Sequence, residues 1–532
     1  MERAGCGSLR HLLRVSAIGY ISALTGCLPQ NSSNTKSSKE AVFAFSGSEN
    51  SATVNSQNSA TVNRSEKGDP LPSNGAGVRI QRAAIQSDQV SDRTVSSGYI
   101  APPAANAQIA EVVDDTPASV ALSSFFKALS TLEHDRERII TVLHLGDSHI
   151  AADRFSGDMR EQFQSRFGSA GRGMMMPGLY LARGVKFDQG GEWEAALSTG
   201  AVPGPYGLTG AKITAQTRDA WLRLTTTDRP FTWTEITLQT GPNQGSAVVA
   251  LDGETKLIPA GASSPSWKTI RLERQAHEIV IRPKGDGPVT VHAVAIGEQK
   301  PGVRYVSLGV PGATAMTPLS WNAGQITHDL QRLAPDLIIL GYGTEESFDD
   351  TLSLRDYEVR ATRMLGVLRQ TAPQASLLVI GPPDIARLPN FAAGASRTAS
   401  DVCRALSPQE RATYDQRVRA SDPRLARWHP PLRLDEVRQA LRRAAAANQA
   451  YFWDWSKIMG GTCGIHAWVH SEPPLAANDH IHLTEEGSKR SARLLFRELM
   501  TGYDAYDRPV AAAEIVKPAA ISAVNSGRKP AR

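Results

Sequence analysis

The sequence predicts an α/β fold, in which a parallel β-sheet is covered by helices on both faces and interrupted by an all-β insertion. Three observations predict it: apolar runs alternate with amphipathic stretches, one central stretch has apolar residues at every second position, and both ends of the chain lack the pattern of a packed core. The chain has 532 residues, of which 41% are hydrophobic, so it is long enough for two or three domains.

The predicted parallel sheet consists of five apolar runs of strand length. These runs are residues 139–145, 303–310, 336–341, 376–380 and 450–455. Helices are predicted ahead of the first run and between or after the later ones, at about residues 116–134, 354–370, 434–448 and 484–500. Such an alternation is typical of parallel strands that are connected by helices.

Ser148 follows the first apolar run, within the tetrapeptide Gly146-Asp147-Ser148-His149. The apolar residues after it recur at four-residue spacing and predict a helix that ends at Gly168. These residues are Phe155, Met159, Phe163 and Phe167. The sequence therefore places Ser148 on a turn from strand to helix.

The all-β insertion is predicted from about residue 190 to residue 297, between the first and second strands of the α/β core. Its runs have a hydrophobic period of two and are separated by turn pairs such as Gly241-Pro242 and Asp252-Gly253. Several short strands with regular turns predict a β-sandwich.

The first 26 residues have the pattern of a signal peptide. A basic start is followed by an apolar run of about 12 residues, which is too short for a membrane span and ends at Cys27. The segment Leu24-Thr25-Gly26-Cys27 resembles the lipobox of bacterial lipoproteins, which implies cleavage ahead of Cys27 and lipid attachment to it. Leu28, where an Asp would favour the inner membrane, favours sorting to the outer membrane. The alternative is a plain secretory signal, and both predict export to the periplasm.

The remaining polar segments complete the predicted organisation. Ser, Asn, Ala and Gln dominate residues 27–115, where the sequence Asn-Ser-Ala-Thr-Val-Asn occurs twice, so this segment cannot bury enough apolar surface to fold and is predicted to be a disordered tether. The predicted parts are a signal peptide (1–26), the tether (27–115), a first part of the core (116–189), the β-rich insertion (190–297), a second part of the core (298–507) and a disordered tail (508–532).

Charge and cysteine content exclude several classes of function. The formal net charge of +5, without a block of like charges, is too weak to indicate a nucleic-acid partner. Export would place Cys403 and Cys463 in an oxidising compartment, which predicts a disulfide between them. Their spacing does not support a zinc site, and His466 and His470 lack a His-Glu-x-x-His pattern, so no metal and no cofactor are predicted.

A base for Ser148 is predicted near the end of the chain. Asp479 precedes His482 by three residues just ahead of a predicted helix, so its carboxylate can hold one ring nitrogen while the other faces away. A strand-end serine with such a pair predicts a nucleophile, a general base and an orienting carboxylate. His149 and His480 are predicted to be hydrogen-bonding neighbours of this site. The nearby Trp453, Trp455 and Trp468 could stack on sugar faces, but two of them lie on or beside a predicted strand, which favours core positions.

These motifs resemble the blocks of the SGNH/GDSL hydrolases. The blocks stand in the family's order as Gly146-Asp147-Ser148, Pro311-Gly312-Ala313, Gly343-Thr344-Glu345-Glu346 and Asp479-His480-Ile481-His482. The resemblance implies a three-layer α/β/α, flavodoxin-like core, with Ser148 as nucleophile, His482 as base and Asp479 as orienting group. It also implies that the backbone N–H groups of Ser148 and Gly312 form an oxyanion hole. Gly381-Pro-Pro-Asp384, the Asp-Ser-His start and the β insertion resemble the peptidoglycan O-acetylesterase branch most.

The third block departs from the family pattern. Glu345 occupies the position of the family's Asn, and an ionised carboxylate has no hydrogen to donate to an oxyanion. Three explanations remain open: another group such as Thr344 donates, Glu345 is protonated, or the enzyme is slow or inactive.

The resulting prediction is an exported serine esterase that removes acyl groups, O-acetyl above all, from a cell-envelope or extracellular polysaccharide such as peptidoglycan. Its predicted partners are the polysaccharide and the membrane that holds the lipid anchor. One alternative is a polysaccharide O-acetyltransferase with the same triad, which passes the acetyl group to a second sugar. The other alternative is an inactive glycan-binding lipoprotein.

Overall fold

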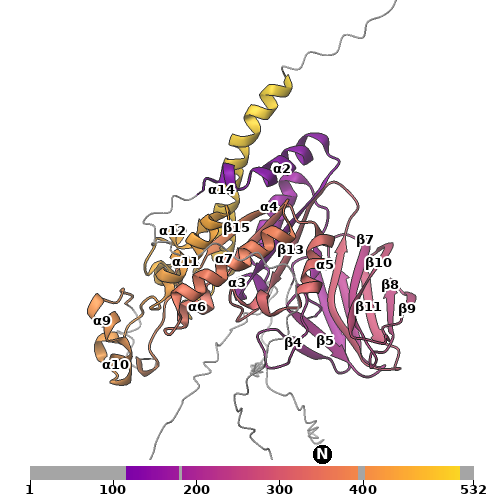
Figure 1. Ribbon diagram of the computed structural model, residues 1–532, viewed down its shortest axis with the longest axis horizontal. Helices are drawn as coiled ribbons and strands as arrows, with labels where there is room; N and C mark the ends of the chain where they lie inside the picture. The colour runs from indigo at the N-terminus through magenta and orange to yellow at the C-terminus, as the bar shows by residue number, and fades with distance from the viewer. Residues whose placement is uncertain (1–115, 179–181, 393–401, 516–532) are drawn as a thin grey trace, which may run out of the picture. The chain divides into compact units, whose positions relative to one another are not determined.

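The computed structural model describes residues 116–178, 182–392 and 402–515 (Figure 1). The predicted signal peptide with Cys27 and the predicted tether lie outside these ranges. Among the described helices, none combines the length and the apolar character that crossing a membrane requires.

The central sheet has five parallel strands in the order β13-β1-β14-β15-β16. Counted among the core strands alone this order is 2-1-3-4-5, the flavodoxin-like order, so the predicted fold class is confirmed. The strands lie where the five apolar runs predicted them: β1 (Ile139–Gly146), β13 (Gly302–Gly309), β14 (Leu337–Gly341), β15 (Ser376–Gly381) and β16 (Tyr451–Asp454).

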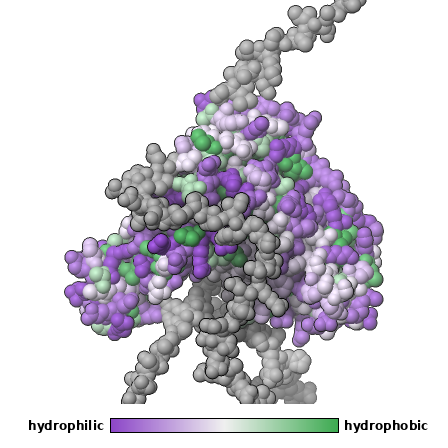
Figure 2. Space-filling model, viewed as in Figure 1, coloured by the Kyte–Doolittle hydropathy of each residue, from purple (hydrophilic) through white to green (hydrophobic). Residues whose placement is uncertain are grey.

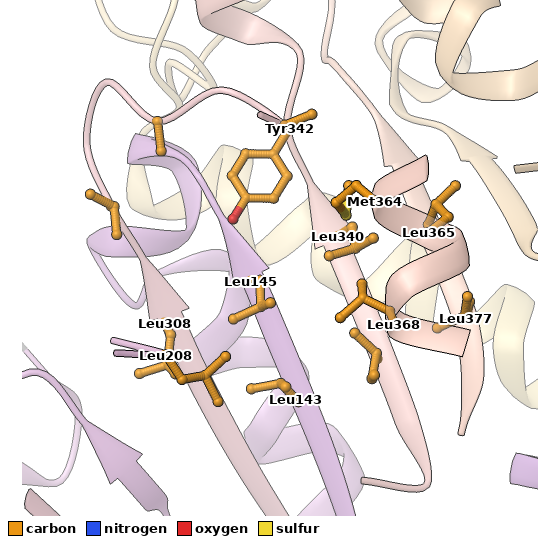
Figure 3. Packing of buried hydrophobic residues seen from close by; sticks show 14 of the residues in the cluster. Leu143, Leu145, Leu208, Leu308, Leu340, Tyr342, Met364, Leu365, Leu368 and Leu377 are labelled. Carbon is orange, nitrogen blue, oxygen red and sulfur yellow. The ribbon is translucent and has the colours of Figure 1, made fainter. Parts of the chain in front are cut away.

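Helices cover both faces of this sheet. Alternate strand residues, such as Leu143 and Leu145 of β1, pack against α5, α7 and α11, and Figure 3 shows Met364, Leu365 and Leu368 of α7 on this face. The intervening strand residues pack against α2, α4 and α14 on the other face. The helices of the first layer are α5 (Ala323–Leu333), α7 (Leu354–Thr371) and α11 (Leu434–Ala447); those of the second include α2 (Ser123–Asp135), α4 (Phe155–Phe167) and α14 (Glu485–Ile515).

Shorter helices lie in the connections, several of them at the carboxyl edge of the sheet. They are α1 (Ala118–Ala121), α3 (Ser148–Ala151), α6 (Thr344–Phe348), α9 (Pro408–Ala412), α10 (Tyr414–Arg419), α12 (Trp455–Met459) and α13 (Gly464–Val469), with 3₁₀ turns at Thr317–Ser320, Asn390–Ala392 and Pro423–Leu425.

The insertion is a sandwich of two antiparallel sheets, with an apolar cluster between them. One sheet contains β10 (Ser266–Ala276), β7 (Phe231–Thr240), β12 (Val289–Gly297), β5 (Ala211–Ala215) and β4 (Glu194–Leu197), with β2 (Gly173–Met175) paired to β12; the other contains β3 (Val185–Gly190), β6 (Trp221–Thr226), β11 (Glu278–Pro283), β8 (Ala247–Leu251) and β9 (Glu254–Ile258). β2 and β3 therefore lie ahead of the predicted start at residue 190. Three residues in β2 are too few to reveal a period.

The β sandwich packs directly on the α/β core. Trp233 of β7 and Leu208, which precedes β5, belong to the same apolar cluster as Leu308 of β13 and Leu145 of β1, and Figure 3 shows the three leucines together. The backbone N–H of Asn322, just ahead of α5, donates to the carbonyl of Tyr206 at 2.9 Å. The insertion is therefore joined to the core by buried contacts as well as by the chain.

The C-terminal helix extends beyond its prediction. The amphipathic pattern predicted a helix near 484–500, whereas α14 runs from Glu485 to Ile515. The predicted tail from residue 508 thus begins inside a helix. Ala511, Ala512 and Ala513 lack an apolar period, but alanine has the highest intrinsic helix propensity.

The described surface is mostly polar. On the face shown in Figure 2, hydrophilic residues predominate and apolar residues form small separate spots. The exposed large hydrophobic side chains come from distant positions: Val120, Val202, Leu257, Leu319, Val359, Val367 and Val402. The described part of this face therefore lacks the continuous apolar area that is typical of a docking surface.

A disulfide joins Cys403 and Cys463, whose Cα atoms are 5.8 Å apart. It links the segment between β15 and α11 to the start of α13, since Cys463 is the residue ahead of that helix. The segment also has its own small cluster of Leu406, Tyr414 and Leu425. The disulfide therefore fastens a peripheral segment to the α/β core.

Replacing both cysteines, by Cys403→Ser with Cys463→Ser, should lower the free energy of unfolding by about 2–4 kcal/mol, because the bond closes a long loop that the unfolded chain would otherwise leave open. Urea unfolding followed by tryptophan fluorescence measures the change. Wild type treated with a reductant should unfold at the same midpoint as the variant. Midpoints that all coincide with that of untreated wild type would contradict a stabilising disulfide.

Candidate active site

Three glycines align at the carboxyl edge of the sheet, so the loops that follow these strands begin side by side. Gly146 of β1 pairs in register with Gly309 of β13 and with Gly341 of β14. A Cβ atom on Gly146 would lie 2.4 Å from Ile150 Cγ1, and one on Gly309 would lie 2.1 Å from the backbone N of Ala151. Helix α3 can therefore lie directly on the strand ends only because glycines stand beneath it.

Ser148 is the first residue of α3, as the strand-to-helix prediction requires. Asp147 caps this helix: its side chain accepts the backbone N–H of His149 at 3.0 Å, and its carbonyl accepts from Ile150 and Ala151. The cap holds the short helix against the edge of the sheet. It also leaves the backbone N–H of Ser148 at the open end of the helix.

The loop ahead of α14 carries Asp479 and His482. One oxygen of Asp479, Oδ1, accepts the backbone N–H groups of Ile481 and His482, each at 2.9 Å. The carbonyl of His482 accepts the N–H of Ala477 at 2.8 Å. These bonds fold the loop back on itself and orient both functional side chains in one direction.

The structure brings Ser148, His482 and Asp479 together, although Ser148 and His482 are 334 positions apart. Ser148 Oγ lies 3.0 Å from His482 Nε2, and His482 Nδ1 lies 2.7 Å from Asp479 Oδ2. Because a carboxylate only accepts, it holds the proton of the ring on Nδ1 and leaves the lone pair of Nε2 facing the hydroxyl. This arrangement can take the proton of the serine hydroxyl.

The charge of Asp479 suits this role. Burial alone would raise its pKa, but the hydrogen bond and charge of His482 and the two backbone N–H groups outweigh burial and lower the pKa. The carboxylate is therefore ionised and can stabilise a positive charge that develops on His482. Both side chains keep about a third of their surface exposed, 29% for His482 and 32% for Asp479, so a substrate can reach them.

The family resemblance implies an oxyanion hole made of the backbone N–H groups of Ser148 and Gly312. Within the described residues, the N–H groups of Ser148 and Gly312 donate to no protein acceptor. Gly312 has a φ of +72°, which explains why a glycine follows Pro311 here. The carbonyl of Pro311 accepts from Thr199 Oγ1 of the β sandwich at 2.9 Å, so the inserted domain contacts this loop.

Thr344 and Glu345, the two side chains considered as a third donor, are placed differently. Thr344 is buried, with its hydroxyl 3.5 Å from His149 Nδ1 and bonded to Asp147, so it is already engaged. Glu345 stays partly exposed. Desolvation and the charge of Asp147 raise the pKa of Glu345, while His149 and His482 act in the opposite direction.

Glu346 was not singled out from the sequence, yet it connects two of the loops. It is buried, and its Oε1 accepts the backbone N–H of Ala315 at 2.7 Å, three residues after Gly312. Burial raises the pKa of Glu346 to about 7. The only signal in the sequence is a second acidic residue on a helix that begins directly after a strand.

The other histidines and tryptophans surround the site without forming a metal centre. His466 Nδ1 lies 2.8 Å from His480 Nε2, and Trp428 stacks on the His480 ring with 3.6 Å between centroids. Across residues 116–178, 182–392 and 402–515, no three His, Cys, Asp or Glu side chains are grouped so that they could hold a metal ion. The three tryptophans predicted to be core residues are buried: Trp453, Trp455 and Trp468.

Comparisons with known proteins find a family and several solved structures that are similar to parts of this chain. Residues 285–490 match the model of the GDSL-like lipase/acylhydrolase family. The match begins inside the β sandwich, so it includes Gly312, Glu345, Asp479 and His482 but not Ser148. No curated protein sequence matches the chain at a significant level.

Among solved structures, a peptidoglycan O-acetylesterase is similar over 75% of this chain and 99% of that chain, with 24% identity and a TM-score of 0.58. A family two carbohydrate esterase from Cellvibrio japonicus aligns over 59% of this chain and 98% of that chain, with 13% identity and a TM-score of 0.23. An acetyl xylan esterase aligns over 37% and 80%, with 12% identity and a TM-score of 0.24. Only the first score is high enough to compare folds. Residues 285–490 are therefore similar to the GDSL-like lipase/acylhydrolase family, and the chain shares its fold with the first of these structures.

Proposed function

We propose that the chain is an exported serine esterase that removes O-acetyl groups from a cell-envelope polysaccharide such as peptidoglycan. The observation that carries the proposal is the continuous hydrogen-bonded chain from Ser148 through His482 to Asp479. The fold shared with a peptidoglycan O-acetylesterase supports the choice of an acetylated glycan.

The proposed reaction has two acyl-transfer steps. Ser148 Oγ attacks the ester carbonyl while His482 Nε2 takes its proton, and the N–H groups of Ser148 and Gly312 hold the negative oxygen. The intermediate expels the sugar oxygen, which receives the proton from His482 and leaves as a hydroxyl group. Water then gives a proton to His482 and attacks the acetyl-serine, which releases acetate and restores Ser148. No cofactor is needed.

Glu345 completes the proposed oxyanion hole when it is protonated. Since the hydroxyl of Thr344 is engaged by Asp147 and His149, Glu345 is the side chain that remains at the position of the family's Asn. Its raised pKa favours a carboxyl group that carries a hydrogen and can donate it. The proposed third donor is therefore available at mildly acidic pH and is lost as the pH rises.

The proposed location follows from the first residues of the chain. We propose a periplasmic lipoprotein that is anchored through Cys27, more in keeping with the outer than with the inner membrane because Leu28 follows the cysteine. Residues 27–115 would then let the enzyme reach its polymer substrate from the membrane.

Replacing the nucleophile, by Ser148→Ala, should lower the hydrolysis of a chromogenic acetyl ester roughly 10³-fold or more, because the acyl-enzyme cannot form. Ser264→Ala, which changes an exposed serine in the β sandwich, serves as the matched control and should keep the wild-type rate. Acetate release from O-acetylated peptidoglycan should show the same pattern. Equal rates for wild type and Ser148→Ala would remove the enzyme proposal and favour an inactive glycan-binding protein.

Restoring the family's side chain, by Glu345→Asn, should raise kcat/KM at pH 8 by about tenfold or more, because one donor of an oxyanion hole is worth about 10²–10³ in rate. The gain should shrink at pH 5.5, because the raised pKa of Glu345 favours the protonated, donating form as the pH falls. Glu345→Ala separates the effect of removing a charge from that of adding a donor. A variant-to-wild-type ratio near one at both pH values would show that the hole needs no donor at this position.

Mass spectrometry of the protein expressed in a Gram-negative host should find a mature chain that begins at an acylated Cys27, because the lipobox directs lipid attachment before cleavage. Cys27→Ser should block both processing and membrane association. An intact leader, or cleavage at another residue without a lipid, would contradict the proposed anchor.

A further inference from the structure

His149 directly follows the proposed nucleophile, and its ring lies between two oxygen acceptors. Nδ1 lies 3.2 Å from Asp147 Oδ1, and Nε2 lies 3.1 Å from the carbonyl oxygen of Ile481. The side chain is only 4% exposed, and Asp147 beside it is only 2% exposed, so water does not compete for either nitrogen.

The two acceptors decide the protonation state of this ring. A carboxylate and a carbonyl oxygen can only accept, whereas a neutral imidazole donates from one nitrogen and presents a lone pair from the other. A neutral His149 would therefore direct a lone pair at an oxygen, and only the imidazolium ion satisfies both contacts. Burial opposes the charged form, but the charge of Asp147 and the hydrogen bonds to Asp147 and Ile481 outweigh burial, and the pKa of His149 is raised.

Asp147 is the counter-ion that makes such a buried charge possible. Burial alone would raise the pKa of Asp147, but the charge of His149 and the hydrogen bonds from His149 and Thr344 lower it. The carboxylate and the imidazolium thus stabilise each other, as a buried pair must.

The ring of His149 lies next to the proposed base. Its centroid is 5.4 Å from that of His482, with the planes tilted by 31°. The charged or titratable groups around His149 are Asp147 in the turn ahead of α3, Asp479 and His482 in the loop ahead of α14, and Glu345 on α6. The other element in ring contact is α12, whose Trp455 is uncharged and lies 5.7 Å away.

We infer that His149 is a positioning residue that acts as a fixed imidazolium: its Nε2–H holds the catalytic loop at Ile481, and its positive charge lies beside the ring of the proposed base, His482. This inference rests on the esterase function proposed above. Two neighbouring hydrogen bonds, Ser148 to His482 and His149 to Ile481, then join α3 to the loop ahead of α14. Asp479 stabilises the proton that His482 takes up during the reaction.

The test is the dependence of kcat/KM on pH, measured with a chromogenic acetyl ester from pH 4.5 to 8.5. In His149→Gln the positive charge beside the proposed base is lost and Asp147 remains, so the acid limb of the profile should move upward by about one unit. Gln still offers an N–H group to the carbonyl of Ile481. A purely structural role would lower the rate at every pH and leave the acid limb in place, which would overturn the inference.

His480→Gln is the matched control. His480 is also a buried histidine of this loop, but burial lowers its pKa to about 4, so the change replaces one neutral side chain by another. The acid limb of this variant should stay at the wild-type pH. Thermal unfolding of both variants checks that they are folded.

A second measurement needs neither activity nor a variant. Wild type labelled with ¹⁵N-histidine should show, at pH 7.5, one ring whose two nitrogens both carry protons. Neutral rings for all histidines would overturn the inference even if the enzyme is active. If one ring is doubly protonated but the wild-type protein is no faster than Ser148→Ala, the charge state inferred for His149 is supported and the esterase function is contradicted.

Discussion

The close approach of α3 to the ends of β1 and β13 is the constraint on which the site depends. Because Gly146 and Gly309 leave no side chain beneath it, the four-residue helix lies on the edge of the sheet, and Ser148 is placed at its first position. The registers of β13, β1 and β14 then determine the level of the neighbouring loops, since Gly312 and Glu345 follow the aligned Gly309 and Gly341 at short distances along the chain. A side chain on either glycine beneath α3 would push the helix away from the sheet and so displace Ser148, even though that side chain makes no contact with the reacting groups.

Much of this arrangement could be predicted from local patterns. Five apolar runs predicted the five core strands, and the strand-end serine with Asp479 and His482 predicted the contact that the structure contains, because parallel strands end at one edge. The contacts that sequence reasoning missed depend on distant partners. Nothing near Glu346 indicates that Ala315 will donate to it, and nothing near Thr344 indicates that Asp147 and His149 will engage its hydroxyl. Short or Ala-rich elements such as β2 and the end of α14 carry no period for a pattern to reveal.

Two pairs of an aspartate and a histidine lie next to each other in the site, and they differ in how far they are buried. The Asp147–His149 pair is 2% and 4% exposed, and the closest polar contacts of the His149 ring are to two oxygens that only accept. The Asp479–His482 pair is about a third exposed, and His482 keeps one nitrogen for the serine. Burial makes the first pair a fixed dipole, because a change in its charge would leave a partner uncompensated. Exposure leaves the second pair within reach of a substrate.

Several carboxyl groups lie close to these histidines, so a substitution that changes the charge of one carboxyl group also affects the pKa values of its neighbours. Asp147 raises the pKa of both Glu345 and Glu346, and its own charge is balanced by His149. Glu346 in turn holds the loop of Gly312 through Ala315, so the charge state of α6 is coupled to the geometry of that loop. When it is ionised, Glu345 adds to this group a negative charge that an amide at position 345 would not add. The departure from the family's Asn therefore changes the charge balance of the whole edge, and the buried imidazolium of His149 is the group best placed to offset it.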